Sequence, residues 1–146
     1  GERGMMVSTK GRYALRVMVD LAEHTTGAYI PLKDIAERQE ISQKYLESIM
    51  AALSKAGFVD ALHGKGGGYK LSRGPGEYTV GSVLKLTEGT LAPVACLEPA
   101  CNPCARAATC KTLPMWAEQN RLIDRFFEGI TLEDLAKNAP NGDYII

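Results

Sequence analysis

Apolar residues recur every three or four positions near the start of the chain. The pattern extends over six of them: Tyr13, Ala14, Val17, Met18, Leu21 and Ala22. Because one turn of an α-helix takes 3.6 residues, this spacing places all six on one face of a helix. It predicts an amphipathic helix over residues 10–24, ending before Thr25-Thr26-Gly27.

The next segment carries two short helical patterns separated by a tight turn. The first places Leu32, Ile35 and Ala36 on one face. The second begins after Ser42, a residue type that caps helix N-termini, and directs four apolar side chains inward: Leu46, Ile49, Met50 and Leu53. Residues 39–41 form the turn between the helices, and two helices joined this closely indicate a helix-turn-helix.

A β-hairpin is predicted directly after the second helix, which Gly57 ends. Residues 58–62 and 69–72 are strand-like runs, and the glycine-rich residues 63–68 lie between them. A hairpin in this position is the wing of a winged helix-turn-helix. Thr79 is then expected to cap a further helix that extends to Glu88.

The C-terminal part of the chain combines a loop with a long helix. Residues 96–110 contain two prolines and no sustained apolar period, which predicts a loop. A long helix follows over residues 112–129, with an apolar stripe at spacings of seven, four and three: Trp116, Ile123, Phe127 and Ile130. Thr131 and Asp134 match a capping box for one last turn.

The predicted fold is mainly α with a small β-hairpin wing. Residues 5–76 are assigned to a winged helix-turn-helix DNA-binding domain, and residues 77–95 to a connecting helix. Residues 96–110 form a cysteine loop that binds a cluster, and residues 111–138 form a dimerisation helix with a C-terminal turn. A chain of 146 residues that is 45% hydrophobic is long enough for one core with such an extension.

The net charge of zero hides a difference between the two halves of the chain. Residues 1–73 carry 11 Lys and Arg against 8 Asp and Glu, and residues 74–146 carry 6 against 9, which gives +3 and −3. This asymmetry is weak evidence for nucleic acid on its own, because a solvated mixed-charge face gives the same count. With no apolar run of about 18 to 20 residues, a soluble cytoplasmic protein without a membrane span is expected.

Exposed residues at the start of the second helix of a helix-turn-helix reach DNA bases or phosphates. The candidate DNA-binding residues lie on that helix, on the first helix and on the wing: Ser8, Lys10, Arg12, Tyr13, Arg16, Ser42, Gln43, Lys44, Tyr45, Glu47, Ser48, His63, Lys65 and Gly66. Among them Glu47 is informative, because a carboxylate facing DNA needs a donor such as cytosine N4. A polar helix face or a glycine-rich hairpin is common and is weak evidence by itself. The two together, in this order and spacing, favour a DNA-binding protein.

No arrangement of catalytic residues is evident in the sequence. Gly64-Lys65-Gly66 lacks the glycine spacing and the following Ser or Thr of a nucleotide-binding loop. No nucleophile and base pair, and no dinucleotide-binding motif, is present. The chain is therefore not expected to be an enzyme.

All four cysteines fall within fifteen residues, in the pattern C-x4-C-x2-C-x5-C: Cys96, Cys101, Cys104 and Cys110. Buried apolar filling is one alternative, although a proline-interrupted loop is a poor place for it. Structural disulfides are another, and an intracellular protein argues against them. Thiolates select zinc or an iron–sulfur cluster. Because only Cys101 and Cys104 form a C-x2-C pair, iron–sulfur is favoured over zinc.

The linked motifs of the chain resemble the Rrf family of regulators, whose members include IscR-like, NsrR-like and CymR-like proteins. The resemblance covers nearly the whole chain, from about residue 5 to residue 135. It rests on STKGRYA at residues 8–14, IAERQEISQKYLESIMAALSKAGFV at 35–59, GKGGGY at 64–69, TVGSVLKLTEG at 79–89, and the cysteines before Trp116. It implies a homodimer, joined by the long C-terminal helix, that binds a roughly palindromic double-stranded DNA operator.

The resemblance also bears on the ligands of a cluster. IscR-like members hold a [2Fe-2S] cluster with three cysteines and a histidine, and nitric-oxide-sensing members hold a [4Fe-4S] cluster with an N-terminal acid. Matched from Trp116, Cys96, Cys104 and Cys110 take the three cysteine positions. Leu113 stands at the histidine position and Arg12 at the acidic one. Cys101 is therefore the expected fourth ligand, and [2Fe-2S] is favoured over [4Fe-4S].

The sequence thus predicts a dimeric transcription repressor or activator whose operator affinity is controlled by an iron–sulfur cluster in the four-cysteine loop. The signal would be redox state, nitric oxide or iron–sulfur status. The alternative is a zinc-stabilised or cluster-free regulator of the same fold, CymR-like and controlled by a partner protein or by thiol oxidation.

Overall fold

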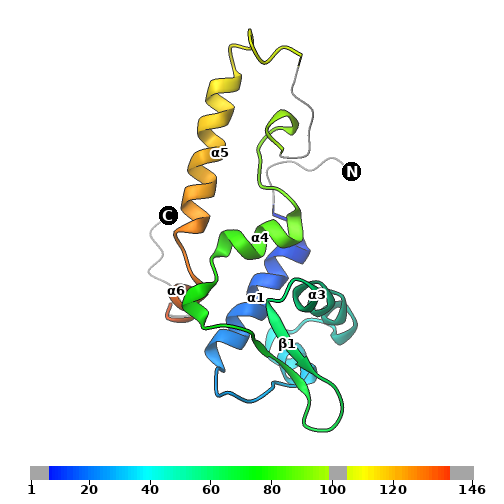
Figure 1. The fold of residues 1–146 in the computed structure, drawn as a ribbon. Helices are drawn as coiled ribbons and strands as arrows, with labels where there is room; N and C mark the ends of the chain where they lie inside the picture. Colours follow the sequence, from blue (N-terminus) through cyan, green and yellow to red (C-terminus); the bar gives the residue numbers. More distant parts are fainter. Residues whose placement is uncertain (1–6, 99–104, 139–146) are drawn as a thin grey trace.

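The computed structural model of the chain describes residues 7–98 and 105–138. Its elements follow the order α1 (Thr9–Glu23), α2 (Leu32–Gln39), α3 (Gln43–Lys55), β1 (Val59–Leu62), β2 (Gly68–Leu71), η1 (Pro75–Glu77), α4 (Val80–Glu88), η2 (Ala95–Leu97), α5 (Leu113–Glu128) and α6 (Leu132–Ala136). The fold is mostly helical with one small antiparallel hairpin, as the sequence predicts (Figure 1). None of these helices is both long and apolar enough to cross a membrane.

Helix α1 is the centre of the fold. Ser8 begins it as N-cap, because its Oγ accepts a hydrogen bond of 3.1 Å from the backbone N–H of Gly11. The middle of its apolar face is completely buried, with Ala14, Val17 and Met18 at 0% exposure. Around this face lie α2, β2, α4 and α6. The helix that the apolar period predicts over residues 10–24 is confirmed within one residue at each end.

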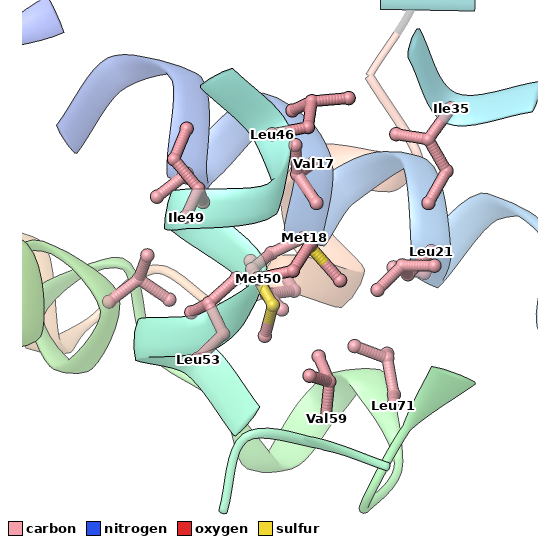
Figure 2. Close-up of a cluster of buried hydrophobic side chains, with 14 of the residues drawn as sticks. Val17, Met18, Leu21, Ile35, Leu46, Ile49, Met50, Leu53, Val59 and Leu71 are labelled. Atoms are coloured by element: carbon pink, nitrogen blue, oxygen red, sulfur yellow. The ribbon is translucent and has the colours of Figure 1, made fainter. Parts of the chain in front are cut away.

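The side chains of α3 close the core against α1. Figure 2 shows Leu46, Met50 and Leu53 of α3 pointing toward Val17 and Met18 of α1, with Val59 and Leu71 of the hairpin below them. The four inward positions predicted for α3 are all buried: Leu46, Ile49, Met50 and Leu53. Burial of one such side chain stabilises the fold by about 1.5–3 kcal/mol. This packing holds α3 at a fixed angle to the body.

The wing is a two-stranded hairpin that is joined to the loop before α2. Residues pair in antiparallel register from Val59 with Leu71 to Leu62 with Gly68. Ile30 adds a bridge to Tyr69 through two backbone hydrogen bonds of 2.8 and 2.9 Å. Gly68 has φ 151°, and a Cβ there would lie 2.2 Å from the Ile30 carbonyl oxygen. Only glycine permits the loop and the wing to approach this closely.

The C-terminal end of α5 is attached to the start of α4. The backbone N–H of Val80 donates to the Ile130 carbonyl at 2.8 Å, and that of Leu132 donates to the Tyr78 carbonyl at 3.1 Å. The capping box of Thr131 and Asp134 is present, and Leu132 of α6 is completely buried. Beyond this attachment α5 extends away from the body (Figure 1). None of its 16 residues is buried.

Two local features differ from the sequence prediction. Helix α2 includes Gln39 and ends at Glu40, which adopts the left-handed conformation with φ 55°. The short turn between α2 and Ser42 imposes this conformation. The spacing of apolar residues therefore could not predict it. The short 3-10 turns η1 and η2 were not predicted either.

We expect replacement of Glu40 by glycine to stabilise the protein. A residue with a Cβ is destabilised by about 1–2 kcal/mol in the left-handed region. Glycine removes this strain, but it also gives the unfolded chain more freedom, which offsets part of the gain. The free energy of unfolding in urea should therefore rise by about 0.5–1 kcal/mol. The matched control is Gly57→Ala at φ 77° in open space, which should lower it. A less stable Glu40→Gly protein would show that the Glu40 side chain contributes more than its backbone strain costs.

Candidate functional site

The first turns of α3 present a continuous polar surface. Ser42 caps the helix, with its Oγ accepting from the Tyr45 backbone N–H at 3.1 Å. All six residues predicted to face DNA on this helix are exposed: Ser42, Gln43, Lys44, Tyr45, Glu47 and Ser48. Since the opposite face is anchored in the core, these side chains are presented on a rigid element.

A buried carboxylate fixes α2 and the turn against α1. Asp20 is 2% exposed and accepts two hydrogen bonds from Arg38, at 3.0 Å from Nε and 2.7 Å from Nη2. It also accepts one from Gln39 Nε2 at 2.9 Å. The hydrogen bonds to Asp20 raise the pKa of Arg38, although burial partly opposes them. This bidentate pair holds the first helix of the helix-turn-helix in one orientation.

Arg16 is exposed and also binds the same turn. Its Nε donates to Gln39 Oε1 at 3.2 Å, and its Nη2 donates to the Gln39 carbonyl. Its guanidinium also lies 5.2 Å from the centre of the Tyr13 ring, which in turn lies 5.7 Å from the ring of Tyr45. Arg16 therefore joins α1 to the turn, and the phosphate contact expected from its charge stays a prediction.

The other two predicted segments flank α3. On α1, Arg12 is exposed, and Ser8, Lys10 and Tyr13 are half-buried. At the wing tip all three predicted residues are exposed: His63, Lys65 and Gly66. The start of α1, α3 and the wing lie along one side of the ribbon in Figure 1. The structure therefore presents the candidate DNA-binding residues on three neighbouring elements.

A second carboxylate ties the start of α1 to the end of α4. Glu88 Oε1 accepts hydrogen bonds from the backbone N–H and the Oγ of Ser8, at 2.8 and 2.6 Å. A Cβ on Gly11 would lie 2.4 Å from the same oxygen. Glu88 is the last residue of α4, eight positions before Cys96. Sequence reasoning missed Glu88, Asp20 and Arg38, because periodicity and spacing do not reveal partners 18 to 80 positions apart.

Two of the four cysteines lie in the described part of the chain. Cys96 is exposed in η2, Cys110 is half-buried just before α5, and both are free thiols. The Thr112 hydroxyl, 3.4 Å from Cys110 Sγ, and the backbone N–H groups of Thr112 and Leu113 lower the pKa of Cys110. The thiolate is the form that binds metals. Cysteine side chains at these two positions fit the donor chemistry of an iron–sulfur or a zinc centre.

The predicted set of four ligands is not completed by these residues. Cys101 and Cys104 lie outside the described residues. Within residues 7–98 and 105–138, no three His, Cys, Asp or Glu side chains come together as a metal site. Leu113, which the family resemblance matches to a histidine ligand, begins α5.

Residues 7–138 match the model of the Rrf2 family, which is described as an iron-dependent transcriptional regulator. The chain belongs to the Rrf2 family. The protein rrf2 of Nitratidesulfovibrio vulgaris is 39% identical over 136 residues, which cover 92% of this chain and 89% of that protein. The transcriptional regulator IscR of Aliivibrio salmonicida is 37% identical over 90% of this chain and 77% of its own length.

Solved Rrf2-family structures share the fold. IscR of T. potens has a TM-score of 0.73 at 34% identity and covers 97% of this chain and 93% of its own. CymR, the global cysteine regulator of B. subtilis, has a TM-score of 0.72 at 34% identity, with 90% and 95% covered. The winged helix fold is therefore confirmed. The relatives are transcriptional regulators and not enzymes, and membership of this family implies DNA binding.

We expect Asp20→Ala to destabilise the Rrf2 fold by about 2–3 kcal/mol, because it leaves Arg38 and Gln39 without their buried acceptor. The loss in the free energy of unfolding should be smaller than for a fully buried ion pair, because the Arg38 side chain is 36% exposed. Urea unfolding measures the change. Lys137→Ala is the control, because its ion pair with Glu133 is exposed and screened by solvent, so its loss should leave the free energy of unfolding nearly unchanged. Equal stability of the two variants would contradict an anchoring role for Asp20.

Proposed function

We propose that this Rrf2-family regulator is a homodimer whose operator affinity is controlled by an iron–sulfur cluster. Cys96, Cys101, Cys104 and Cys110 would hold the cluster, with [2Fe-2S] favoured over [4Fe-4S]. When bound, it supplies a centre that responds to oxidants, nitric oxide or iron–sulfur supply. The observation that carries the proposal is the grouping of all four cysteines within fifteen residues, and the lowered pKa of Cys110 agrees with it. The family description and the IscR relatives support it.

In this proposal each part of the chain has a separate task. Residues 5–76 bind DNA, residues 77–95 connect, residues 96–110 hold the cluster, and residues 111–138 join two subunits. The exposed start of α3 enters the major groove, where Glu47 selects bases by accepting a hydrogen bond. Lys44 and Lys65 bind phosphates and position the protein without reading sequence.

The contact between Ser8 and Glu88 offers a route from the cysteines to DNA. Glu88 ends the helix that leads into the cysteine segment, and Ser8 caps the helix that carries Arg12. A change in the cysteine segment that moved the end of α4 would therefore alter the start of α1. Such a route needs two conformations with different operator affinity, and cluster status would shift their populations.

The surface of α5 supports dimerisation. The sequence placed the apolar stripe at Trp116, Ile123, Phe127 and Ile130, and these four side chains are half-buried within one chain. A neighbouring stripe is more exposed, with Met115 at 55%, Leu122 at 52% and Phe126 at 59%. An apolar stripe of this size on a projecting helix is typical of a subunit interface. The proposed two-fold contact therefore includes Met115, Leu122 and Phe126.

Anaerobic purification followed by absorption spectroscopy and metal analysis tests the cluster. The proposal requires visible charge-transfer bands together with iron and acid-labile sulfide. Colourless protein with stoichiometric zinc would instead establish the zinc-stabilised regulator. Colourless protein with no metal would leave a cluster-free, CymR-like regulator and contradict the proposal.

Single cysteine substitutions identify the ligands. We expect Cys96→Ala, Cys104→Ala and Cys110→Ala each to abolish the visible spectrum, because each removes a charged ligand. Cys101→Ala should abolish it too, or leave a labile cluster with altered bands. Thr109→Ala, an exposed change in the same segment, is the control. A Cys101→Ala protein with unchanged spectrum and cluster lifetime would exclude Cys101 as the fourth ligand.

Salt titrations separate positioning contacts from base contacts. Lys65→Ala and Lys44→Ala should each weaken binding to all DNA sequences and reduce the slope of log K against log salt by about 0.9. Glu47→Ala should keep the slope and reduce discrimination between operator and altered operator. Lys137→Ala, at the C-cap of α6, is the control for loss of a positive charge. An unchanged salt slope in Lys65→Ala would remove the wing from the DNA interface.

A charge in the exposed stripe of α5 should prevent dimerisation. Leu122→Asp and Phe126→Asp each place two like charges in the proposed interface, so sedimentation at micromolar concentration should show monomers. Ala107→Asp, an exposed change outside α5, should remain dimeric. A wild-type protein that is a monomer under these conditions while it binds its operator would overturn the dimer.

A further inference from the structure

A hollow lies at the base of the wing, away from the cysteine segment. It has a volume of about 340 Å³ and is formed by the end of α1, the loop before α2, β2 and the residues that leave β2. This volume is at the lower end of the range for small-molecule sites, roughly 300–1,000 Å³. The proposed DNA and cluster sites use none of the residues that line it.

Two positive side chains line the hollow, and aromatic rings hold both of them in place. Lys70 Nζ lies 4.7 Å from the centre of the Tyr29 ring. The Arg73 guanidinium lies 4.7 Å from the centre of the Tyr78 ring and 5.7 Å from that of Phe58. Within the described residues, neither cation forms an ion pair with a carboxylate. In the described part of the chain the N–H groups of both cations are therefore also without a carboxylate partner, so an anion would not have to displace one.

The one carboxylate that lines the hollow does not neutralise these cations by a direct pair. Asp60 lies opposite Lys70 in the hairpin register, yet it accepts a hydrogen bond of 3.0 Å from Ser72 Oγ. The balance of Lys70 and Arg73 against Asp60 leaves the lining positive. This charge selects against cations and favours a ligand with a single negative charge.

The remaining lining is largely apolar. Leu21, Ile30 and Leu71 are each less than 10% exposed and contribute to the hollow from three different elements. His24 stands beside them, with its Nδ1 2.7 Å from the Asp20 carbonyl oxygen. Apolar walls with a few charged groups are typical of sites for small organic molecules.

We propose that this hollow binds a small organic carboxylate with an apolar body. Its carboxylate pairs with Lys70 and Arg73. Its body lies over Ile30 and Leu71, between the exposed Ala28 and the half-buried Pro75, which also line the hollow. The site spans the bridge between Ile30 and Tyr69, so a bound acid touches both the wing and the loop before the helix-turn-helix. This adds a ligand site that does not depend on the cluster or on dimerisation.

The site can be tested on the full-length protein with 4-fluorophenylacetate as the probe. Fluorine NMR follows the probe, and proton–nitrogen NMR follows the protein. We expect saturable binding in the millimolar range, with shifts at the backbone amides of Ala28, Lys70 and Ser72. The uncharged 4-fluorophenylacetamide has nearly the same shape and should bind at least about tenfold more weakly, because it lacks the charge-assisted contacts.

Three variants separate charge from shape. Lys70→Met should weaken probe binding about tenfold by removing one cation. Ala28→Phe, at an exposed lining residue, should block the hollow while keeping both cations. Lys33→Met removes an exposed lysine of α2 outside the hollow and should bind the probe as wild type does. The amide spectrum of each variant shows whether it is folded.

Three results would overturn the site. One is the absence of saturable shifts at these amides, and a second is equal binding of the acid and the amide. The third is a DNA contact only: Lys70→Met reduces operator affinity and its salt slope while the acid leaves the wild-type spectrum unchanged. Each of these can be distinguished from failure of the cluster, because the probe experiment does not require one.

Discussion

Burial of one face of α1 is the constraint on which the structure depends. Ala14, Val17 and Met18 have no exposed surface, and α2, α4, α6 and the hairpin pack around the same helix. Because protein cores are close-packed, none of these elements can move along α1 without opening a cavity. The position of α3, which presents the candidate DNA-binding surface, follows from this packing.

The same helix carries two buried or half-buried polar contacts that link distant parts of the chain. Near its C-terminal end, Asp20 holds the helix-turn-helix through Arg38. At its N-terminal end, Ser8 donates a hydrogen bond to Glu88, which lies shortly before the cysteine segment. A rigid helix between two such contacts is well suited to couple the cysteine segment to DNA binding. Coupling of this kind requires two conformations in which these contacts differ, and the proposed mechanism supposes two such conformations.

Local sequence signals predicted the elements well. Periodicity located α1 and α3, Ser42 and Thr131 marked helix starts, and the glycines marked the wing. Long-range partners such as Ser8 and Glu88 could not be predicted, because no local pattern connects them. The apolar spacing correctly predicted that α5 is a helix. Which of its side chains remain exposed depends on how α5 packs against α4, and the most exposed apolar side chains include Phe126. Glu40 shows that a tight turn can impose a conformation that its residue type disfavours.

The operator affinity of one preparation, measured with its cluster intact and again after the cluster is removed anaerobically, tests the central claim most directly. The account predicts at least about a tenfold difference, equivalent to about 1.4 kcal/mol of coupling, and its reversal when the cluster is rebuilt. Equal affinity in both states, in a protein shown to hold iron and sulfide, would contradict control of DNA binding by the cluster.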